Sequence, residues 1–182
     1  MTKEKNDFKK MESIIYFCDI HNFSKICLEL DNEGADFIQT YYHTIGESII
    51  KKGGKIIKYM GDCIYALFPY DLIFEVISAA KKCKSEFHNL LKEFNISEPS
   101  ELEAGIGCGE VICGDFGHPS CRYYDAFGVK VNETAMIMHH RGIAVTEDVY
   151  KRIYHEIKLK KLPNKTVKWS QKPLKVWEIT SD

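Results

Sequence analysis

The sequence predicts an α+β domain, in which a mixed β-sheet is flanked by helices, and three observations support this fold class. Apolar runs of strand length, such as Ser13–Asp19, end in turn residues. Longer segments, such as Asp71–Phe94, repeat apolar residues at helical spacing. The two kinds follow one another in the order βααββαββαβαββ, which mixes hairpins with helical crossovers. We therefore expect the helices to pack mainly on one face of the sheet.

Local signals place the individual elements. Gly53 and Gly54 stop the second helix, and Met60-Gly61-Asp62 joins two strands as a hairpin. In chain order, the predicted elements are strand Ser13–Asp19, helices Asn22–Leu30 and Gly34–Lys52, strands Lys55–Tyr59 and Cys63–Phe68, helix Asp71–Phe94, strands Leu102–Cys113 and Arg122–Phe127, a helix over 129–142, strand Ile143–Val145, a short helix from Thr146, and strands near Ile157–Leu162 and Leu174–Ile179.

Glycines make the strand over Leu102–Cys113 unusual, because they occupy alternate positions 105, 107 and 109. A strand face without side chains admits the close approach of another backbone. The segment Gly114–Ser120 is expected to turn. In the helix over 129–142 (VKVNETAMIMHHRG), Asn132 and Met136 lie one turn apart on the same side.

Composition and charge indicate one globular domain over residues 1–182, with its core over about 13–180. A chain of 182 residues can bury a substantial core, and 45% hydrophobic with 28% charged residues is ordinary for a globular protein. The net charge of −1 gives no general attraction to nucleic acid or to a membrane surface. We expect no nucleic-acid partner, and any bound polyanion needs a local site or a metal ion.

The cysteines and the apolar runs indicate a cellular compartment. The seven cysteines form no CxxC motif and lie mostly in apolar runs, which is typical of free thiols in a reducing environment. The first residues lack the apolar region of a signal peptide, and no apolar run approaches the roughly 18 residues that span a bilayer. We expect a cytoplasmic protein without a membrane segment.

Two aspartates end apolar strands, where burial gives a carboxylate no benefit. Asp19 follows IIYFC, and Asp62 lies at the tip of the hairpin. If the first strand lies beside the hairpin, the two carboxylates meet and repel, and a divalent cation removes that conflict. An oxygen-only pair suits Mg²⁺ or Mn²⁺, which keep positions open for substrate phosphates. In the alternative interpretation, Asp19 caps the next helix and Asp62 is only a turn residue.

Five segments in this order resemble the motifs of class III nucleotidyl cyclase catalytic domains, which are the adenylate and guanylate cyclases. They are FCDIHNFS, GGKIIKYMGDCIYALF, AGIGCGEVICGDFG, YYDAFGVKVNETA and AVTED, and the resemblance covers about Ile14 to Ile179. It implies a ferredoxin-like cyclase fold, with a mixed sheet flanked by helices. It also implies a head-to-tail homodimer with two sites at the interface, each built from both chains.

The resemblance implies two-metal chemistry on a nucleoside triphosphate. Asp19 and Asp62, with Ile20 as a further metal-site position, would hold two Mg²⁺ or Mn²⁺ ions per site. One ion activates the ribose 3′-OH and the other binds the triphosphate, so that the 3′-oxygen attacks the α-phosphorus and pyrophosphate leaves. The loop before the next helix is expected to contact the phosphates through its backbone: Ile20, His21, Asn22, Phe23 and Ser24.

The resemblance also implies residues that read the base and hold the ribose. Lys58 and Asp125 match the base-reading pair, and Asp125 would accept a hydrogen bond from the exocyclic amine of adenine, which favours ATP over GTP. Asn132 matches the catalytic asparagine that contacts the ribose. Without the resemblance, Lys58 is a solvated strand residue and Asn132 a buried amide satisfied by backbone.

Two positions depart from the family pattern. Met136 stands where an arginine stabilises charge on the α-phosphate, and the loss of one such donor costs about 10²–10³ in rate. Trp169-Ser170 replaces a Gly-Lys pair whose lysine binds phosphate. Several cations could substitute for the missing ones: Arg122, His139, His140 and Arg141 for the arginine, and Lys168 and Lys172 for the lysine.

The predicted function is therefore the conversion of ATP to 3′,5′-cyclic AMP and pyrophosphate. One alternative is a pyrimidine nucleotide cyclase of an antiphage system, since Asp125 would also accept from the amine of cytosine. The other is a catalytically weak cyclase domain that needs a partner chain, because Met136 carries neither charge nor donor.

Overall fold

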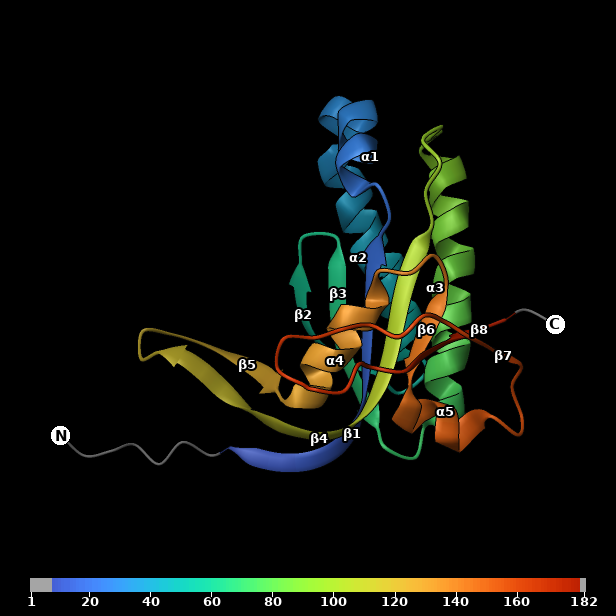
Figure 1. Ribbon diagram of the computed structural model, residues 1–182. Helices are drawn as coiled ribbons and strands as arrows, with labels where there is room; N and C mark the ends of the chain where they lie inside the picture. Colours follow the sequence, from blue (N-terminus) through green and yellow to red (C-terminus); the bar gives the residue numbers. More distant parts are fainter. Residues whose placement is uncertain (1–7, 181–182) are drawn as a thin grey trace.

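A computed structural model describes residues 8–180, and its elements follow the predicted order, with one 3₁₀ turn added between the first two helices (Figure 1). The strands are β1 (Lys9–Ile20), β2 (Lys55–Met60), β3 (Cys63–Pro69), β4 (Leu102–His118), β5 (Cys121–Phe127), β6 (Ile143–Thr146), β7 (Leu159–Lys161) and β8 (Val176–Ile179). The helices are α1 (Phe23–Leu30), α2 (Gly34–Ile50), α3 (Ile73–Glu93), α4 (Val129–Met138) and α5 (Glu147–Ile153), and the 3₁₀ turn η1 is Asp31–Glu33.

All the strands join one mixed sheet in the order β2-β3-β1-β4-β6-β8-β7, and β5 pairs with the far end of β4. Only the β4–β6 pair is parallel; the other pairs are antiparallel. β1 lies between β3 and β4, so that Cys18 is opposite both Ile64 and Ala104. This central position buries β1 from Ile14 to Cys18, which explains its continuous apolar run.

The two faces of the sheet carry different layers, as expected for helices packed mainly on one face. Side chains of α1, α2, α3 and α5 form the larger core against one face. On the other face, α4 packs alone over a smaller core that includes Phe17, Tyr65 and Val131. Figure 1 shows α4 crossing in front of the sheet while α2 and α3 lie behind it.

Several predicted boundaries were wrong, and the largest error concerns β4. Of the segment Gly114–Ser120 only the last two residues turn, because β4 continues to His118 and pairs with β5 from Ile112 to the end. Only two residues connect the two strands. Gly117, near the end of β4, has φ +128°, and a Cβ at this position would collide with the carbonyl oxygen of Cys121. The glycines that suggested a turn instead serve a strand pair. β1 also begins four residues early, at Lys9.

The β4–β5 hairpin and the start of β1 project beyond the body of the sheet (Figure 1). Phe8 stacks on Phe116 in this arm, with ring centroids 4.6 Å apart. Several large apolar side chains of this region remain exposed, among them Met11, Tyr123, Tyr124, Phe127 and Val129. An exposed apolar surface of this kind is typical of an interface between chains.

The alternate glycines of β4 seat α4, as the sequence predicted. A Cβ on Gly105 would lie 2.8 Å from the carbonyl oxygen of Thr134, and one on Gly107 only 1.9 Å from the Thr134 hydroxyl. Thr134 is fully buried and its hydroxyl donates to the carbonyl of Lys130 at 2.7 Å. The helix therefore lies directly on the backbone of the strand.

Candidate active site

Asp19 and Asp62 meet at one end of the sheet, as their positions at strand ends predicted. The backbone N–H of Ile20 donates to Asp62 Oδ2 at 3.3 Å, across the β1–β3 edge. Burial, followed by the negative charge of Asp62, raises the pKa of Asp19 from 3.8 to about 7. The pair thus shows the charge conflict that a divalent cation relieves.

Two tyrosines of α2 fix the hairpin tip that carries Asp62. The hydroxyl of Tyr41, fully buried, donates to the carbonyl oxygen of Asp62 at 2.9 Å. The hydroxyl of Tyr42 donates to the carbonyl of Gly61. Asp62 therefore lies in a turn that α2 holds in place. In the alternative interpretation, it was only a turn residue.

Glu103, which the sequence analysis missed, places a third carboxylate beside the pair. It lies opposite Asp19 in the β1–β4 register, is only 6% exposed, and adds to the rise in the pKa of Asp19. His21 Nδ1 lies 3.1 Å from one oxygen of Glu103, and His139 Nδ1 lies 3.8 Å from the other and from Asp19 Oδ2. Arg141 extends this chain, with Nη2 3.0 Å from His21 Nε2.

The donor set suits a hard divalent cation that is completed by substrate. Carboxylate oxygens are the preferred protein ligands of Mg²⁺ and Mn²⁺. Asp19 and Asp62 supply two such carboxylates, which would leave positions for phosphate oxygens and water. Glu103 is engaged by His21 instead.

The loop from Ile20 to Ser24 leads into α1, but without the helix cap that one interpretation of Asp19 required. No side chain caps the helix, which begins at Phe23. Asn22 adopts φ 61°, and its amide donates to Glu98 at 3.1 Å and to the carbonyl of Pro99 at 3.3 Å. The Asn22 side chain thus anchors the loop, and any phosphate contact by Ile20, His21, Asn22, Phe23 or Ser24 would use backbone groups.

Lys58 and Asp125 form a direct ion pair between β2 and β5, with Nζ 2.6 Å from Oδ2. Asp125 is 15% exposed and also accepts from the N–H of Ala126 at 2.8 Å. Lys58 is therefore not the freely solvated strand residue of the alternative interpretation. The structure brings together the two residues that the sequence assigned to base reading.

Asn132 and Met136 lie on the side of α4 that faces away from the sheet. Asn132 is exposed, which contradicts the alternative of a buried amide, while Val131 and Thr134 point into the core. The ammonium of Lys165, another residue that the sequence analysis missed, donates to the carbonyl of Met136. Lys165 is held in place by backbone hydrogen bonds with Leu174 at 2.9 and 2.8 Å.

The cations that the sequence offered as substitutes lie in different places. Arg141 contacts His21, His139 lies beside Asp19, and His140 Nε2 is 3.5 Å from Glu178. Arg122 is the second residue of β5 and lies opposite Gly117, near the tip of the β4–β5 hairpin. Lys172 lines a small cavity with Lys130 and Ser170, whereas Lys168 is exposed. Among residues 8–180, the lysine that forms a hydrogen bond with Met136 is Lys165, not Lys168 or Lys172.

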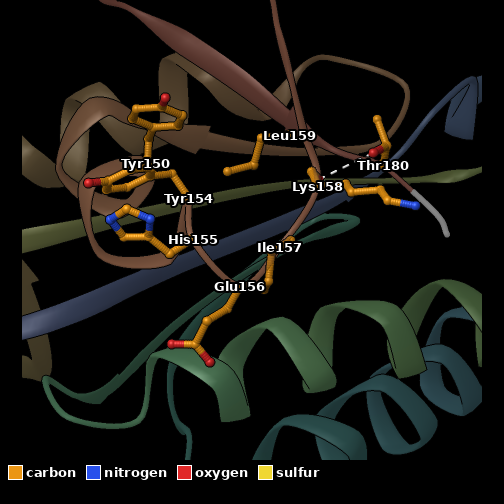
Figure 2. Close-up of a pocket in the computed structure, with 8 residues that line it drawn as sticks. All are labelled: Tyr150, Tyr154, His155, Glu156, Ile157, Lys158, Leu159 and Thr180. Carbon is orange, nitrogen blue, oxygen red and sulfur yellow. Dashed lines mark hydrogen bonds between the residues drawn. The ribbon is translucent and has the colours of Figure 1, made fainter.

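Within residues 8–180 of one chain, the predicted residues form two separate pairs, Asp19 with Asp62 and Lys58 with Asp125, and no side-chain hydrogen bond joins Asn132 to either. No hydrogen bond or ion pair within residues 8–180 joins Asp19 and Asp62 to Lys58, Asp125 or Asn132. A different cavity, of about 430 Å³, is shown in Figure 2 beside Tyr150, Tyr154, His155 and the ends of β7 and β8. None of the predicted site residues lines it, so we do not place the active site there.

The fold and the paired carboxylates define the class of protein as a nucleotide cyclase domain. The model of the family described as the adenylate and guanylate cyclase catalytic domain matches residues 7–181. The chain therefore belongs to this family. Class III cyclases generally use Mg²⁺ or Mn²⁺, which agrees with the donor set at Asp19 and Asp62.

Known relatives and structures agree with this assignment. The chain is 27% identical over 179 residues to the terminal-differentiation specific adenylate cyclase of Dictyostelium discoideum, covering 91% of this chain and 8% of that protein. It is 23% identical over 146 residues to adenylate cyclase type 10 of Rattus norvegicus, covering 73% and 9%. The chain thus spans less than a tenth of these curated relatives.

The structure of the adenylyl cyclase CyaB from P. aeruginosa has the same fold. Its TM-score is 0.89 at 20% identity, and 97% of each chain is covered. This likeness confirms the predicted class III cyclase fold, with its mixed sheet flanked by helices. Within residues 8–180, no helix has the length and apolar character that crossing a membrane requires.

Proposed function

We propose that this domain converts ATP to 3′,5′-cyclic AMP and pyrophosphate at the interface of a head-to-tail homodimer. The observation that carries the proposal is the meeting of Asp19 and Asp62, since burial, followed by repulsion from Asp62, raises the pKa of Asp19 to about 7. A site that is unfavourable when empty of cations becomes favourable when Mg²⁺ or Mn²⁺ brings a triphosphate.

The reaction forms one bond and breaks one. The ribose 3′-oxygen bonds to the α-phosphorus, the bond from that phosphorus to the bridging oxygen of the β-phosphate breaks, and the 3′-OH proton passes to solvent. Bound Mg²⁺ or Mn²⁺ would supply charge neutralisation and a lowered pKa of the 3′-OH. Asp19 and Asp62 would hold the cations, and the anchored hairpin tip keeps Asp62 in position.

The second chain would complete the site, because the two residue groups do not meet within one chain. Lys58 and Asp125 neutralise each other in the absence of a base. An adenine ring could replace this contact, with Lys58 donating to a ring nitrogen and Asp125 accepting from the amine. The exposed apolar side chains of the β4–β5 arm support the proposed homodimer.

Lys165 is the residue that we propose to take over part of the role of the missing arginine. Its ammonium already contacts the backbone of Met136, on the helix that carries Asn132. Among residues 8–180 it forms no ion pair with a carboxylate, so its charge remains available to a phosphate. A lysine offers a point charge without the two-pronged geometry of arginine, which predicts slow turnover.

A product assay tests the proposal. The purified protein is incubated with ATP, GTP, CTP or UTP and Mn²⁺, and cyclic products are identified by mass. We expect cyclic AMP as the main product. Cyclic CMP or cyclic UMP would instead support the pyrimidine alternative, since Asp125 can also accept from cytosine. No product from any nucleotide would reject all these activities.

The second candidate function is that of a weak cyclase domain that needs a partner chain. Met136 and Ser170 favour it, because they stand where the family has an arginine and a lysine. A mixture with a cyclase domain that keeps the arginine but lacks both carboxylates tests it directly. Activity above the sum of the separate chains would show that a partner supplies the missing cation. If the mixture only adds the separate activities, the homodimer stands.

A further inference from the structure

A cavity of about 610 Å³ lies between α3 and the β7–β8 edge of the sheet, and neither Asp19 nor Asp62 lines it. It is lined by Lys81 and Lys84 of α3, Arg141, Gly142 and Ile143 before and in β6, Lys160 of β7, Glu178 and Ile179 of β8, and Thr180 directly after β8. The volume is in the range of small-molecule sites in proteins. Its wall therefore combines residues of four elements, α3, β6, β7 and β8.

The cavity is strongly positive, although the whole chain carries a net charge of only −1. Four of its lining residues are cationic and one, Glu178, is acidic. Glu178 is already engaged, because its carboxylate lies 3.5 Å from His140 Nε2. Like charges that face one cavity repel each other, and a bound anion removes that repulsion.

The cations of the cavity differ in how far they are neutralised. Lys84 lies 3.2 Å from the carboxylate of Glu101. Lys81 and Lys160, by contrast, have no carboxylate partner among residues 8–180. Arg141 contacts His21 through Nη2, which leaves its other N–H donors for a ligand. The cavity thus offers two free ammonium groups and a planar guanidinium, a combination suited to phosphate oxygens.

The floor of the cavity is apolar. Ile143 is 5% exposed and Ile179 is 8% exposed, so both present only a small apolar surface beneath the cations. From the charge, the size and this floor, we propose that the cavity is an anion site for a small organic molecule that carries at least two negative charges of the phosphate type. This inference is independent of the proposed cyclase activity, because none of the paired aspartates takes part.

Binding of inorganic pyrophosphate, measured by isothermal titration calorimetry, tests the proposal. EDTA is present throughout, so that no divalent cation recruits pyrophosphate to Asp19 and Asp62. We expect the wild-type protein to bind. The double variant K81A/K160A should bind at least about tenfold more weakly, because two charge-assisted hydrogen bonds are lost. Both lysines are exposed, so the variant should fold normally.

A matched control separates the cavity from the general charge of the protein. The double variant K82A/K161A removes two lysines from the same helix and strand, but neither lines the cavity. Lys82 pairs with Glu86, and the Lys161 ammonium lies 3.6 Å from the Trp177 ring centroid. We expect this control to bind like the wild type. No binding by the wild type, or equal affinities of the two double variants, would overturn the proposal.

Discussion

The carboxylate end of the sheet and the exposed side of α4 differ in how completely one chain builds them. At the carboxylate end, Asp62 is fixed by a buried tyrosine, and Asp19 lies near a third acid, Glu103, and one histidine, His139. On α4, Asn132 is exposed and Met136 carries no charge. One chain can thus preorganise the two metal-ligand carboxylates. The exposed side of α4, by contrast, depends for its charge on the groups that approach it, namely substrate, partner chain and Lys165.

The largest expected effect concerns the carboxylate end of the sheet, which one chain builds more completely. Asp62→Ala should lower kcat/KM by at least about 10³, since metal-ion stabilisation contributes several kcal/mol. Asp19→Ala should have an effect of the same size. Rates of cyclic product formation with Mn²⁺ measure both, and circular dichroism verifies the fold. Activity near the wild-type level in either variant would refute the metal assignment.

The next effect concerns the exposed side of α4, which carries no cation of its own at Met136. Met136→Arg should raise kcat by about 10–10², because a charged donor at this position stabilises charge that develops on the α-phosphate. Met136→Leu is the matched control, which keeps the size and adds no charge, and should leave the rate unchanged. If the arginine variant gains nothing, the exposed side of α4 does not face the α-phosphate.

Replacement of Lys165 should have a smaller effect on the rate than the arginine substitution at Met136. Lys165→Met should lower kcat about tenfold with little change in KM, as expected for an interaction made mainly in the transition state. In the Met136→Arg background the loss should shrink, because the two cations would serve the same charge. The exposed Lys168→Met is the control. An equal loss in both backgrounds would indicate a structural role for Lys165.

The raised pKa of Asp19 predicts a pH dependence of stability without metal. Since this pKa rises from 3.8 to about 7, the folded protein holds a proton that the unfolded chain has released between these values. The free energy of unfolding should therefore fall as the pH rises from about 4 to 7. Denaturant titrations in EDTA measure this. Asp19→Asn should flatten the slope, and a slope that persists unchanged would assign it to other groups.

The smallest effect concerns the anchored hairpin tip. Tyr41→Phe removes the hydrogen bond to the carbonyl of Asp62 and should cost about 1 kcal/mol of stability. Weaker Mn²⁺ binding should accompany the loss, since Asp62 becomes less well positioned. Tyr150→Phe, which changes a tyrosine that lines the separate cavity of Figure 2, is the control. Unchanged Mn²⁺ affinity would show that the turn is rigid without Tyr41.

The sequence predicted the features that depend on neighbouring residues or on strand ends. Asp19 and Asp62 were recognisable because a carboxylate that ends an apolar strand is costly, and their meeting followed from the order of the strands. The glycines at 105 and 107 likewise predicted a close backbone contact, which α4 makes.

The features that the sequence did not reveal arise from contacts between distant segments. Glu103 lies within a glycine-rich strand and is recognisable only from its register with Asp19. Lys165 lies 29 positions from Met136, on a segment with little regular structure. The extension of β4 was missed because Gly114 and Gly117 are typical of turns, and only the pairing with β5 shows that they belong to a strand.

The glycine seat of α4 has a consequence for how this enzyme family member could be altered. Because a methyl group at Gly105 or Gly107 would collide with Thr134, a larger residue at either position would push α4 off the strand. The location of Asn132 and Met136 relative to the sheet therefore depends on the absence of side chains at two residues of β4, a strand to which neither of them belongs.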